Sequence, residues 1–444
     1  MSRARWIAVA AGILLAAGGP LCGVERFPPP EFTGGHVLPE TTVPGPEPRT
    51  AGWVDVTVLL AGLVLAAWVS LKLRSRAAMV VLSLGALAYF GFWRRGCVCA
   101  IGAVQNVARG VADAEYAVPL AVAAFFVLPL VFALIWGRAF CAGVCPHGAI
   151  QDLVLVKPVK VPRWLDAGLR VVPWVYLGLA VLLAATGGLF IICKYDPFVG
   201  IFRMSGSRAM LLTGAGLLVL GMFVGRPYCR YLCPLGVLLG VSSRAAKWRP
   251  TVTPGACTQC RLCESACPFG ALDYGSSEVP EQERLATERK RVLVMLLAAP
   301  VAVLGFGWLG GKAGLATTAW HPDGKLAALV AAGEKGELKG GIPDEVTAYR
   351  RQGARRDEVY ARAAAVENRA LPIGRVIGGL LGLVLAAKAG QAFFPKRSRD
   401  YQTDPEHCVS CTRCFSACPY ELARRGIPIE TPEEGKTMGE ANEK

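Results

Sequence analysis

The chain has 444 residues, of which 53% are hydrophobic and 18% charged, with a formal net charge of +15. This composition excludes a set of ordinary soluble domains and favours a protein whose solvent is largely lipid. The lysines and arginines form small clusters beside apolar segments rather than one continuous basic face, which favours membrane orientation over nucleic-acid binding.

Apolar segments recur along the chain, and most approach the roughly 20 residues that a helix needs to cross a bilayer. The seven clearest are residues 53–71, 77–93, 117–136, 171–192, 209–224, 292–309 and 373–394. A further segment, 6–17, is either a signal peptide or a first membrane anchor, and both alternatives stay open. The pattern predicts an all-α polytopic membrane protein with seven or eight transmembrane helices.

Clusters of lysine and arginine border alternate connections, and the positive-inside rule places these connections in the cytoplasm of a bacterial inner membrane. The opposite, periplasmic connections are 25–52, 94–116, 194–208 and 311–372. The predicted organisation is a leader or anchor (1–22), a Pro- and Gly-rich periplasmic linker (23–52), a membrane domain (53–250), the first half of a cytoplasmic domain (251–285), a transmembrane helix (286–310), a periplasmic insert (311–372), another transmembrane helix (373–395), and the second half of the cytoplasmic domain with a polar tail (396–444).

Two four-cysteine runs ending in proline, 257–268 and 408–419, follow the bacterial ferredoxin pattern. In that pattern three closely spaced thiolates bind one 4Fe-4S cluster and the fourth binds the other. The predicted ligands are Cys257, Cys260, Cys263 and Cys418 for one cluster, and Cys408, Cys411, Cys414 and Cys267 for the second. Zinc and disulfides are the alternatives, but zinc sites normally use paired CxxC units and disulfides are rare in the cytoplasm.

The two runs must meet in one small domain in order to exchange ligands. Two predicted spans, 292–309 and 373–394, lie between them, and an even number of crossings returns the chain to its starting side. We therefore predict a small ferredoxin-like two-cluster domain on the cytoplasmic side, assembled from two separated segments.

A second pattern, GRxxCxxxCP, occurs twice, at 137–146 and 225–234, each time directly after an apolar segment. Its cysteines are Cys141 and Cys145 in the first copy, Cys229 and Cys233 in the second. This internal repeat indicates related halves. Its four thiols could bind a third cluster or another thiophilic metal, or form redox-active pairs; alternatively, each cysteine packs as a small apolar residue.

A degenerate copy of this unit surrounds Cys97 and Cys99, because residues 102–106 echo residues 148–152. The predicted topology places it on the opposite face of the membrane, together with Cys193 and possibly Cys22. The group is either a redox or metal site, or a structural disulfide or simple packing in an oxidising compartment.

Two ionisable residues are candidates for proton handling: His147 beside the first CxxxCP unit, and Asp196 on the periplasmic side. Both are expected at membrane interfaces, where solvated loop residues are the alternative. Haem is not predicted, because no histidine lies inside a span and CxxCH is absent. Covalent flavin is not predicted either, because residues 213–216 lack the closing Ser or Thr of an attachment sequence.

The order of spans, two GRxxCxxxCP units and a ferredoxin run resembles the NosR/NapH family of polyferredoxin-like membrane proteins, on residues 137–152, 225–239 and 257–268. The resemblance implies electron transfer from the quinol pool or a cytoplasmic donor to a soluble or periplasmic oxidoreductase, with possible quinol dehydrogenase activity. Two alternatives stay open: a copper reductase or assembly factor for a respiratory metalloenzyme, and a redox-responsive membrane regulator.

Overall fold

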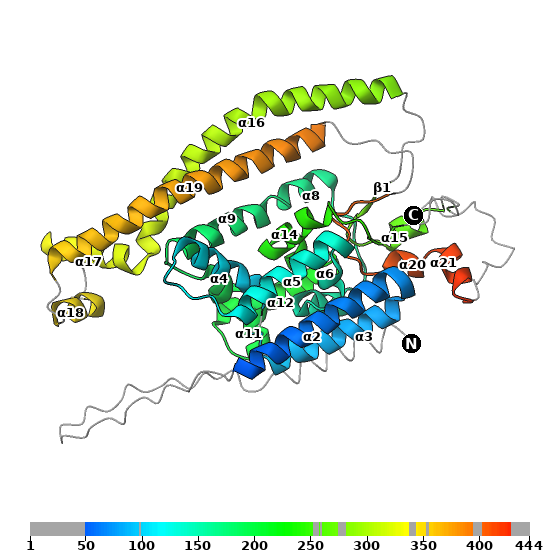
Figure 1. Cartoon of the computed structure of the whole chain (residues 1–444), viewed down its shortest axis with the longest axis horizontal. Helices are drawn as coiled ribbons and strands as arrows, with labels where there is room; N and C mark the ends of the chain where they lie inside the picture. Colours follow the sequence, from blue (N-terminus) through cyan, green and yellow to red (C-terminus); the bar gives the residue numbers. More distant parts are fainter. Residues whose placement is uncertain are drawn as a thin grey trace, which may run out of the picture.

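The computed structural model describes residues 49–96, 99–251, 257, 260–273, 281–336, 343–351, 355–393 and 402–427. Within these residues the chain is almost entirely helical, with one two-stranded sheet (Figure 1). The predicted helical architecture is therefore confirmed for the described part of the chain.

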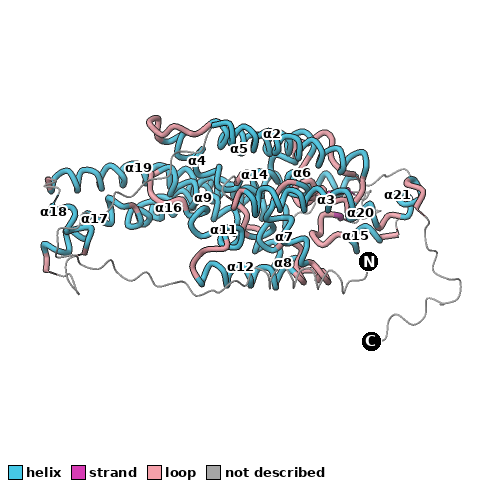
Figure 2. The backbone as a smooth tube through the Cα atoms, turned by 90° about the horizontal axis from the view of Figure 1, so that it is seen from below, coloured by secondary structure: helices cyan, strands magenta, loops and turns pink. Residues whose placement is uncertain are grey.

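The first part of the chain forms a compact bundle of full and partial helices (Figure 2). Its elements are α2 (Arg49–Trp68), the π-helix η1 (Val69–Leu73), α3 (Arg76–Ala86), the π-helix η2 (Leu87–Trp93), α4 (Ala100–Ala112), α5 (Leu120–Trp136), α6 (Ala139–Gly143), α7 (Pro146–Val154), α8 (Arg163–Leu169), α9 (Val172–Ala185), α10 (Ile191–Tyr195), α11 (Pro197–Arg203), α12 (Arg208–Gly221), α13 (Pro227–Tyr231) and α14 (Pro234–Ser243).

The second part contains a long helical hairpin and a small domain built from two segments. Its elements are α15 (Leu262–Ala266), β1 (Leu272–Asp273), α16 (Glu281–Thr317), the 3-10 helix η4 (Thr318–Trp320), α17 (Pro322–Glu334), α18 (Asp344–Arg351), α19 (Arg356–Phe393), β2 (Gln402–Thr403), α20 (Arg413–Ser416) and α21 (Pro419–Arg424).

In the described part of the chain, five helices are long and apolar enough to cross a membrane: Thr50–Leu73, Arg76–Trp93, Trp164–Ala185, Val292–Trp320 and Arg356–Gly390. A sixth candidate is the pair α11 and α12, which is bent by 103° at the break between them. Helix α5, expected to span, is apolar but has only 17 residues. The segment 6–17 lies outside the described residues, so the count of seven or eight spans stays a prediction.

Each GRxxCxxxCP unit folds as two short helices joined at its Cys-Pro step. Proline occupies the first position of α7 and of α14, where its missing N–H costs nothing, and the preceding cysteine is the extended N-cap. The tip of the first unit penetrates the bundle, because Val144 packs against Gly62 in the middle of α2. Both ends of this unit face the small domain, through Arg138 and Asp152. The first unit therefore forms a tight helical turn that enters the bundle.

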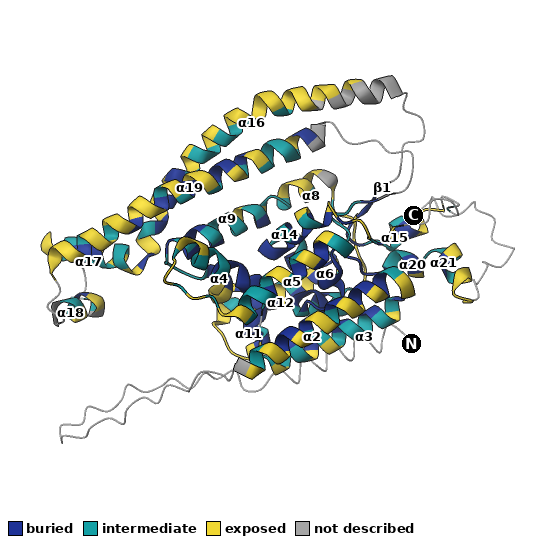
Figure 3. Cartoon of the chain, viewed as in Figure 1, coloured by how far each residue is buried: buried dark blue, intermediate teal, exposed yellow. Residues whose placement is uncertain are grey.

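The long hairpin of α16 and α19 is held by close backbone contact. A Cβ added at Gly310 would lie 2.2 Å from the carbonyl oxygen of Gly374, and one at Gly378 would lie 2.1 Å from that of Phe306. Such small residues at helical spacing are typical of helix pairs packed in lipid. The outer surface of α16 is mostly exposed, as expected for a helix facing lipid (Figure 3).

Both hairpin helices run well beyond the predicted spans 292–309 and 373–394. The region 311–372 therefore contains the ends of α16 and α19 together with α17 and α18. Within this region the described residues place the end of α18 at Arg351 and the start of α19 at Arg356.

The antiparallel hairpin returns the chain to its starting end, where the two ferredoxin runs meet (Figure 1). Strand β1 pairs with β2 antiparallel, with Leu272 opposite Thr403 and Asp273 opposite Gln402. Helix α15 packs against α20 in the same unit. Segments about 130 residues apart thus form one small domain, as the even number of crossings requires.

Candidate metal centres

The structure brings the eight ferredoxin cysteines into two groups. The thiol of Cys263 interacts electrostatically with Cys260, Cys257 and Cys418. The thiol of Cys414 interacts with Cys411, Cys408 and Cys267, and after these with Cys263 of the first group, so the two groups are adjacent. This is the grouping that exchange of the fourth ligand between runs requires, with Cys418 and Cys267 each joining the other run. The presence of a cluster in each group stays a prediction.

The two groups differ in their surroundings. Cys260 is exposed, whereas Cys411 is buried against the membrane domain. Burial raises the pKa of the Cys408 thiol to about 12. Because a metal ligand must be the thiolate, binding of a cluster to this group must release protons.

The four cysteines of the repeated unit also converge. Cys233 interacts electrostatically with Cys229, Cys145 and Cys141. Three of them are buried and Cys229 is half-buried. We call this set the inner thiol site: Cys141, Cys145, Cys229 and Cys233. The two copies of the repeat therefore contribute equally to one site.

Each copy of the repeat sends its arginine into the other copy. Arg226, from the second copy, binds Asp152 at the end of the first through two hydrogen bonds of 3.0 and 2.7 Å, and donates to the carbonyl oxygen of Cys141. Arg138, from the first copy, lies against Gly236 of the second. Both arginines are buried.

The glycine that follows each Cys-Pro step makes room for this exchange. A Cβ on Gly148 would lie 2.8 Å from the carbonyl oxygen of Cys141 and 3.0 Å from Nη1 of Arg226. A Cβ on Gly236 would lie 3.3 Å from Nη2 of Arg138. Larger side chains at these two positions would displace the arginines from the thiols.

Arg138 is a buried cation without a carboxylate in ion-pair contact among the described residues. Its Nη2 lies 3.7 Å from Sγ of Cys141, its Nη1 donates to the backbone oxygen of Glu406 at 2.7 Å, and its Nε has no hydrogen-bond partner in the described part of the chain. An uncompensated buried charge is costly. Thiolates at the inner thiol site would supply the missing negative charge.

Nitrogen donors also point at the sulfurs. The amide of Gly236 donates to Sγ of Cys233 at 3.3 Å, and Nε2 of Gln151 donates to Sγ of Cys229 at 3.3 Å. Hydrogen bonds to sulfur are among the features that set the potential of an iron–sulfur cluster. The donor set therefore fits a thiolate-bound 4Fe-4S cluster.

No three Cys, His, Asp or Glu side chains in the described ranges lie close enough to bind a single metal ion. A cubane cluster binds each thiolate at a different iron corner, so its ligands need not surround one point. The arrangement is thus unlike a single tetrahedral zinc site, whose sulfurs lie about 2.3 Å from one ion.

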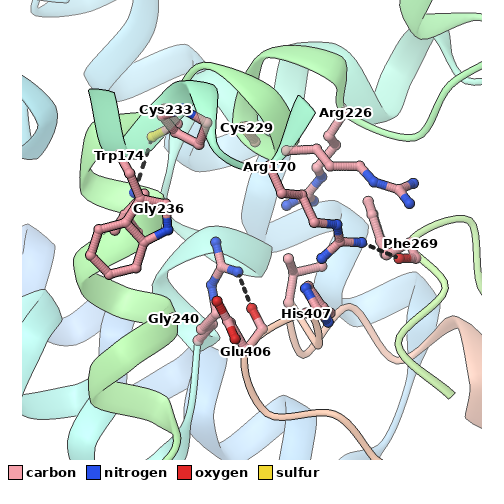
Figure 4. A pocket seen from close by; sticks show the side chains of 15 residues that line it. Arg170, Trp174, Arg226, Cys229, Cys233, Gly236, Gly240, Phe269, Glu406 and His407 are labelled. Atoms are coloured by element: carbon pink, nitrogen blue, oxygen red, sulfur yellow. Dashed lines mark hydrogen bonds between the residues drawn. The ribbon is translucent and has the colours of Figure 1, made fainter. Parts of the chain in front are cut away.

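A cavity of about 60 Å³ connects the inner thiol site to the small domain (Figure 4). Cys229 and Cys233 line one side, and Phe269, Glu406 and His407 line the other. Phe269 and His407 are next or near neighbours of the ferredoxin ligands Cys267 and Cys408 in the sequence.

His147 and Asp196, expected at opposite interfaces, are in direct contact. Nε2 of His147 lies 3.1 Å from Oδ2 of Asp196, and both side chains are 1% exposed. The hydroxyl of Tyr228 donates to the same carboxylate at 2.8 Å. The solvated-loop alternative is therefore wrong for both residues, because the segments that carry them enter the bundle from opposite ends and meet inside it.

The third cysteine group is only partly described. Cys22 and Cys97 lie outside the described residues, whereas Cys99 and Cys193 line a cavity of about 230 Å³ at the end of the bundle away from the ferredoxin-like domain. Asp196 lines the same cavity.

Reasoning from sequence found the cysteines but missed the polar residues around them: Arg138, Arg226, Gln151 and Asp152. The sequence does contain a signal for these residues, because the arginine recurs in both copies of the repeat and the pair Gln151-Asp152 follows the first copy. Its meaning depends on contacts between the two copies.

Two models of 4Fe-4S binding domains match this chain, one over residues 118–163 and 209–251, the other over residues 249–272. The first model covers both CxxxCP units. Protein NirI of Paracoccus denitrificans is 34% identical over 154 residues, 32% of this chain and 22% of that protein. The putative electron transport protein YccM of Escherichia coli is 30% identical over 156 residues, 31% of this chain and 43% of that protein.

The regulatory protein NosR of Pseudomonas aeruginosa is 29% identical over 154 residues, 31% of this chain and 21% of that protein. These similarities support a relationship to the NosR/NapH-like polyferredoxin proteins. The chain spans less than half the length of these three relatives, and no solved structure matches it. The 4Fe-4S models and the apolar helices together support an iron–sulfur membrane protein.

Proposed function

We propose that this protein carries electrons between its ferredoxin-like domain and its membrane domain, using two 4Fe-4S clusters in the former and a third at the inner thiol site. The observation that carries the proposal is the buried guanidinium of Arg138, which faces Cys141 and has no carboxylate counter-ion among the described residues. A bound cluster would supply one-electron transfer without bond-making chemistry.

The protein fixes the ferredoxin-like domain against the inner thiol site through arginines of the membrane domain. These arginines donate to backbone carbonyl oxygens at or near the ferredoxin cysteines. The contacts are Arg138 to Glu406 (2.7 Å), Arg76 to Cys411 (3.2 Å), Arg170 to Phe269 (3.3 Å) and Arg230 to Pro268 (3.2 Å). The Cys408 group is thus held next to the inner thiol site, which favours electron transfer between them.

The wider setting follows from the family and from the charge pattern. The ferredoxin-like domain lies on the cytoplasmic side of a bacterial inner membrane. Electrons from the quinol pool or from a cytoplasmic donor pass to an oxidoreductase partner. In one version of this proposal, the electrons cross the membrane to a periplasmic reductase. A redox-responsive regulator is the second candidate, favoured by the similarity to a protein named regulatory protein NosR.

Iron and sulfide analysis of the purified full-length protein tests the third cluster, together with EPR of the reduced state. We expect about twelve irons per chain, against about eight for ferredoxin clusters alone. Cys229→Ser should remove about four irons and one EPR component while leaving the ferredoxin signals. Cys193→Ser is the matched control and should keep all twelve. Eight irons in the wild type, unchanged by Cys229→Ser, would overturn the proposal.

A further inference from the structure

Cys193 lies in α10, which packs against α4, and Cys99 directly precedes α4. Cys99 is the N-cap residue of this 13-residue helix. Sγ of Cys193 lies 3.0 Å from the point where Gly102 would carry a Cβ, in the first turn of the same helix. The two thiols interact electrostatically. They are therefore neighbours, although 94 positions separate them in the sequence.

A glutamine holds Cys193 in place, as another glutamine does at the inner thiol site. Oε1 of Gln105 accepts a hydrogen bond from the amide of Ile192 at 2.9 Å, directly before Cys193. Oε1 of Gln151 accepts one from the amide of Tyr228 at 3.0 Å, directly before Cys229. Both glutamines lie six positions after a helix-capping cysteine. The outer arrangement is thus a structural copy of half of the inner site.

The copy differs in one donor. Nε2 of Gln151 donates to Sγ of Cys229, but Nε2 of Gln105, which is fully buried, has no hydrogen-bond partner in the part of the chain that is described. A buried unpaired amide is costly. Because the equivalent atom, Nε2 of Gln151, donates to a cysteine sulfur, we expect Nε2 of Gln105 to donate to a cysteine sulfur in another redox state of the Cys99 and Cys193 pair.

The surroundings allow access from outside and contact with the inner site. Cys193 is exposed and borders the cavity of about 230 Å³, together with Arg94 and Arg203. On its other side, Cys99 shares a cavity of about 20 Å³ with Cys145 of the inner thiol site. Cys99 therefore lies between the inner site and the cavity.

We propose that Cys99 and Cys193 form a redox-active dithiol pair that exchanges with thiols or disulfides entering the cavity. In its reduction, the bond between the two sulfurs breaks, two electrons and two protons are taken up, and two thiols form. The electrons come either from an iron–sulfur donor, in two successive one-electron transfers with two protons from solvent, or from an external dithiol, which gives up its two thiol protons and becomes a disulfide. Coupling to the iron–sulfur donor rests on the proposed function, whereas formation of the pair does not.

The geometry also sets the order of attack. An incoming thiolate reaches the exposed Cys193 first and forms a mixed disulfide with it, and Cys99 is the leaving group. Burial raises the pKa of the Cys99 thiol to about 12 and outweighs the backbone hydrogen bonds from the first turn of α4, which lower it. Cys99 therefore takes up a proton as it leaves.

Differential thiol labelling of the full-length protein, with mass spectrometry of the peptides, tests the pair in oxidised and reduced dithiothreitol buffers. We expect Cys99 and Cys193 to lose labelling together in the oxidising buffer, to appear as one linked peptide, and to recover on reduction. In Cys193→Ser, Cys99 should stay labelled in both buffers, whereas Cys97→Ser should behave as the wild type.

A glycine pair provides a finer test. Gly102→Ala places a methyl group against Sγ of Cys193, whereas Gly85→Ala meets no atom within 4 Å. We expect the first variant to weaken disulfide formation at least tenfold, a shift of about 30 mV for a two-electron couple, and the second to leave it unchanged.

Three outcomes would overturn the pair: Cys99 labelled equally in both buffers, Cys99 linked to Cys97, or protection of both thiols that a metal chelator removes. The result is separable from the third cluster. If the disulfide forms in a protein with only eight irons, the dithiol pair is supported and the proposed third cluster is rejected. If no disulfide forms in a protein with twelve irons, the third cluster is supported and the dithiol pair is rejected.

Discussion

Arg226 and Asp152 form a buried ion pair that joins the two copies of the GRxxCxxxCP repeat, with Nη2 of the arginine 2.7 Å from Oδ2 of the carboxylate. Arg76 and Arg413 also lie within ion-pair distance of Asp152, at 3.0 and 3.7 Å. Burial would raise the pKa of Asp152, but these three cations more than offset it and hold the pKa well below its ordinary value. The carboxylate at the end of the first copy therefore compensates charges from the second copy, from α3 and from the ferredoxin-like domain.

Asp152→Asn should destabilise the folded protein strongly. Removing the carboxylate leaves several cations buried together without a counter-charge, which typically costs about 3–5 kcal/mol. Thermal unfolding of the detergent-purified protein measures the loss. Asp113→Asn, whose pair with Arg109 is longer at 3.9 Å and partly exposed, should cost at most about 1 kcal/mol. Equal effects in the two variants would contradict the role of Asp152.

Cys418→Ser should alter the same EPR signal as Cys260→Ser. Although Cys418 belongs to the second run, its thiol interacts with Cys263 of the first, so we predict it as the fourth ligand of that cluster. Cys411→Ser should alter the other signal. If Cys418→Ser and Cys411→Ser changed the same signal, each run would bind its own cluster and the exchange would be rejected.

Arg138→Gln should lower the reduction potential of one cluster, the one at the inner thiol site. Reduction adds negative charge there, and the buried guanidinium beside Cys141 stabilises it. We expect a fall of at least about 60 mV, a tenfold change for a one-electron couple, in an EPR-monitored titration. Arg138→Lys should recover part of the potential, and Arg109→Gln, at the far end of the bundle, should leave it unchanged. A shift confined to the ferredoxin signals would place the charge at another site.

Gly310→Leu should separate the hairpin of α16 and α19, because a side chain there meets the backbone of Gly374. We expect a loss greater than the roughly 1–3 kcal/mol of ordinary overpacking, measured as a lower thermal midpoint and faster proteolysis of the 311–372 region. Gly305→Leu lies on the same helix with nothing within 4 Å of its Cβ, and should be neutral. Neutral behaviour of both variants would mean that the helices do not touch at Gly310.

The sequence by itself determined the helical membrane character and the two ferredoxin runs. Apolar length and cysteine spacing are local properties, and an even number of crossings sufficed to place both runs at one end of the molecule. Spacing also identified the repeated CxxxCP units as related, because a repeat can be recognised without knowledge of its contacts.

Only the tertiary structure decided what surrounds those cysteines. Arg138 and Arg226 each act on the opposite copy of the repeat, and His147 meets Asp196 from 49 positions away. These pairs depend on segments that turn back inside the bundle, whereas a count of apolar residues treats every connection as a loop at the surface. Burial then supplies the physical reason for the contacts: a charged or polar group that loses water inside the bundle must find a partner in another part of the chain.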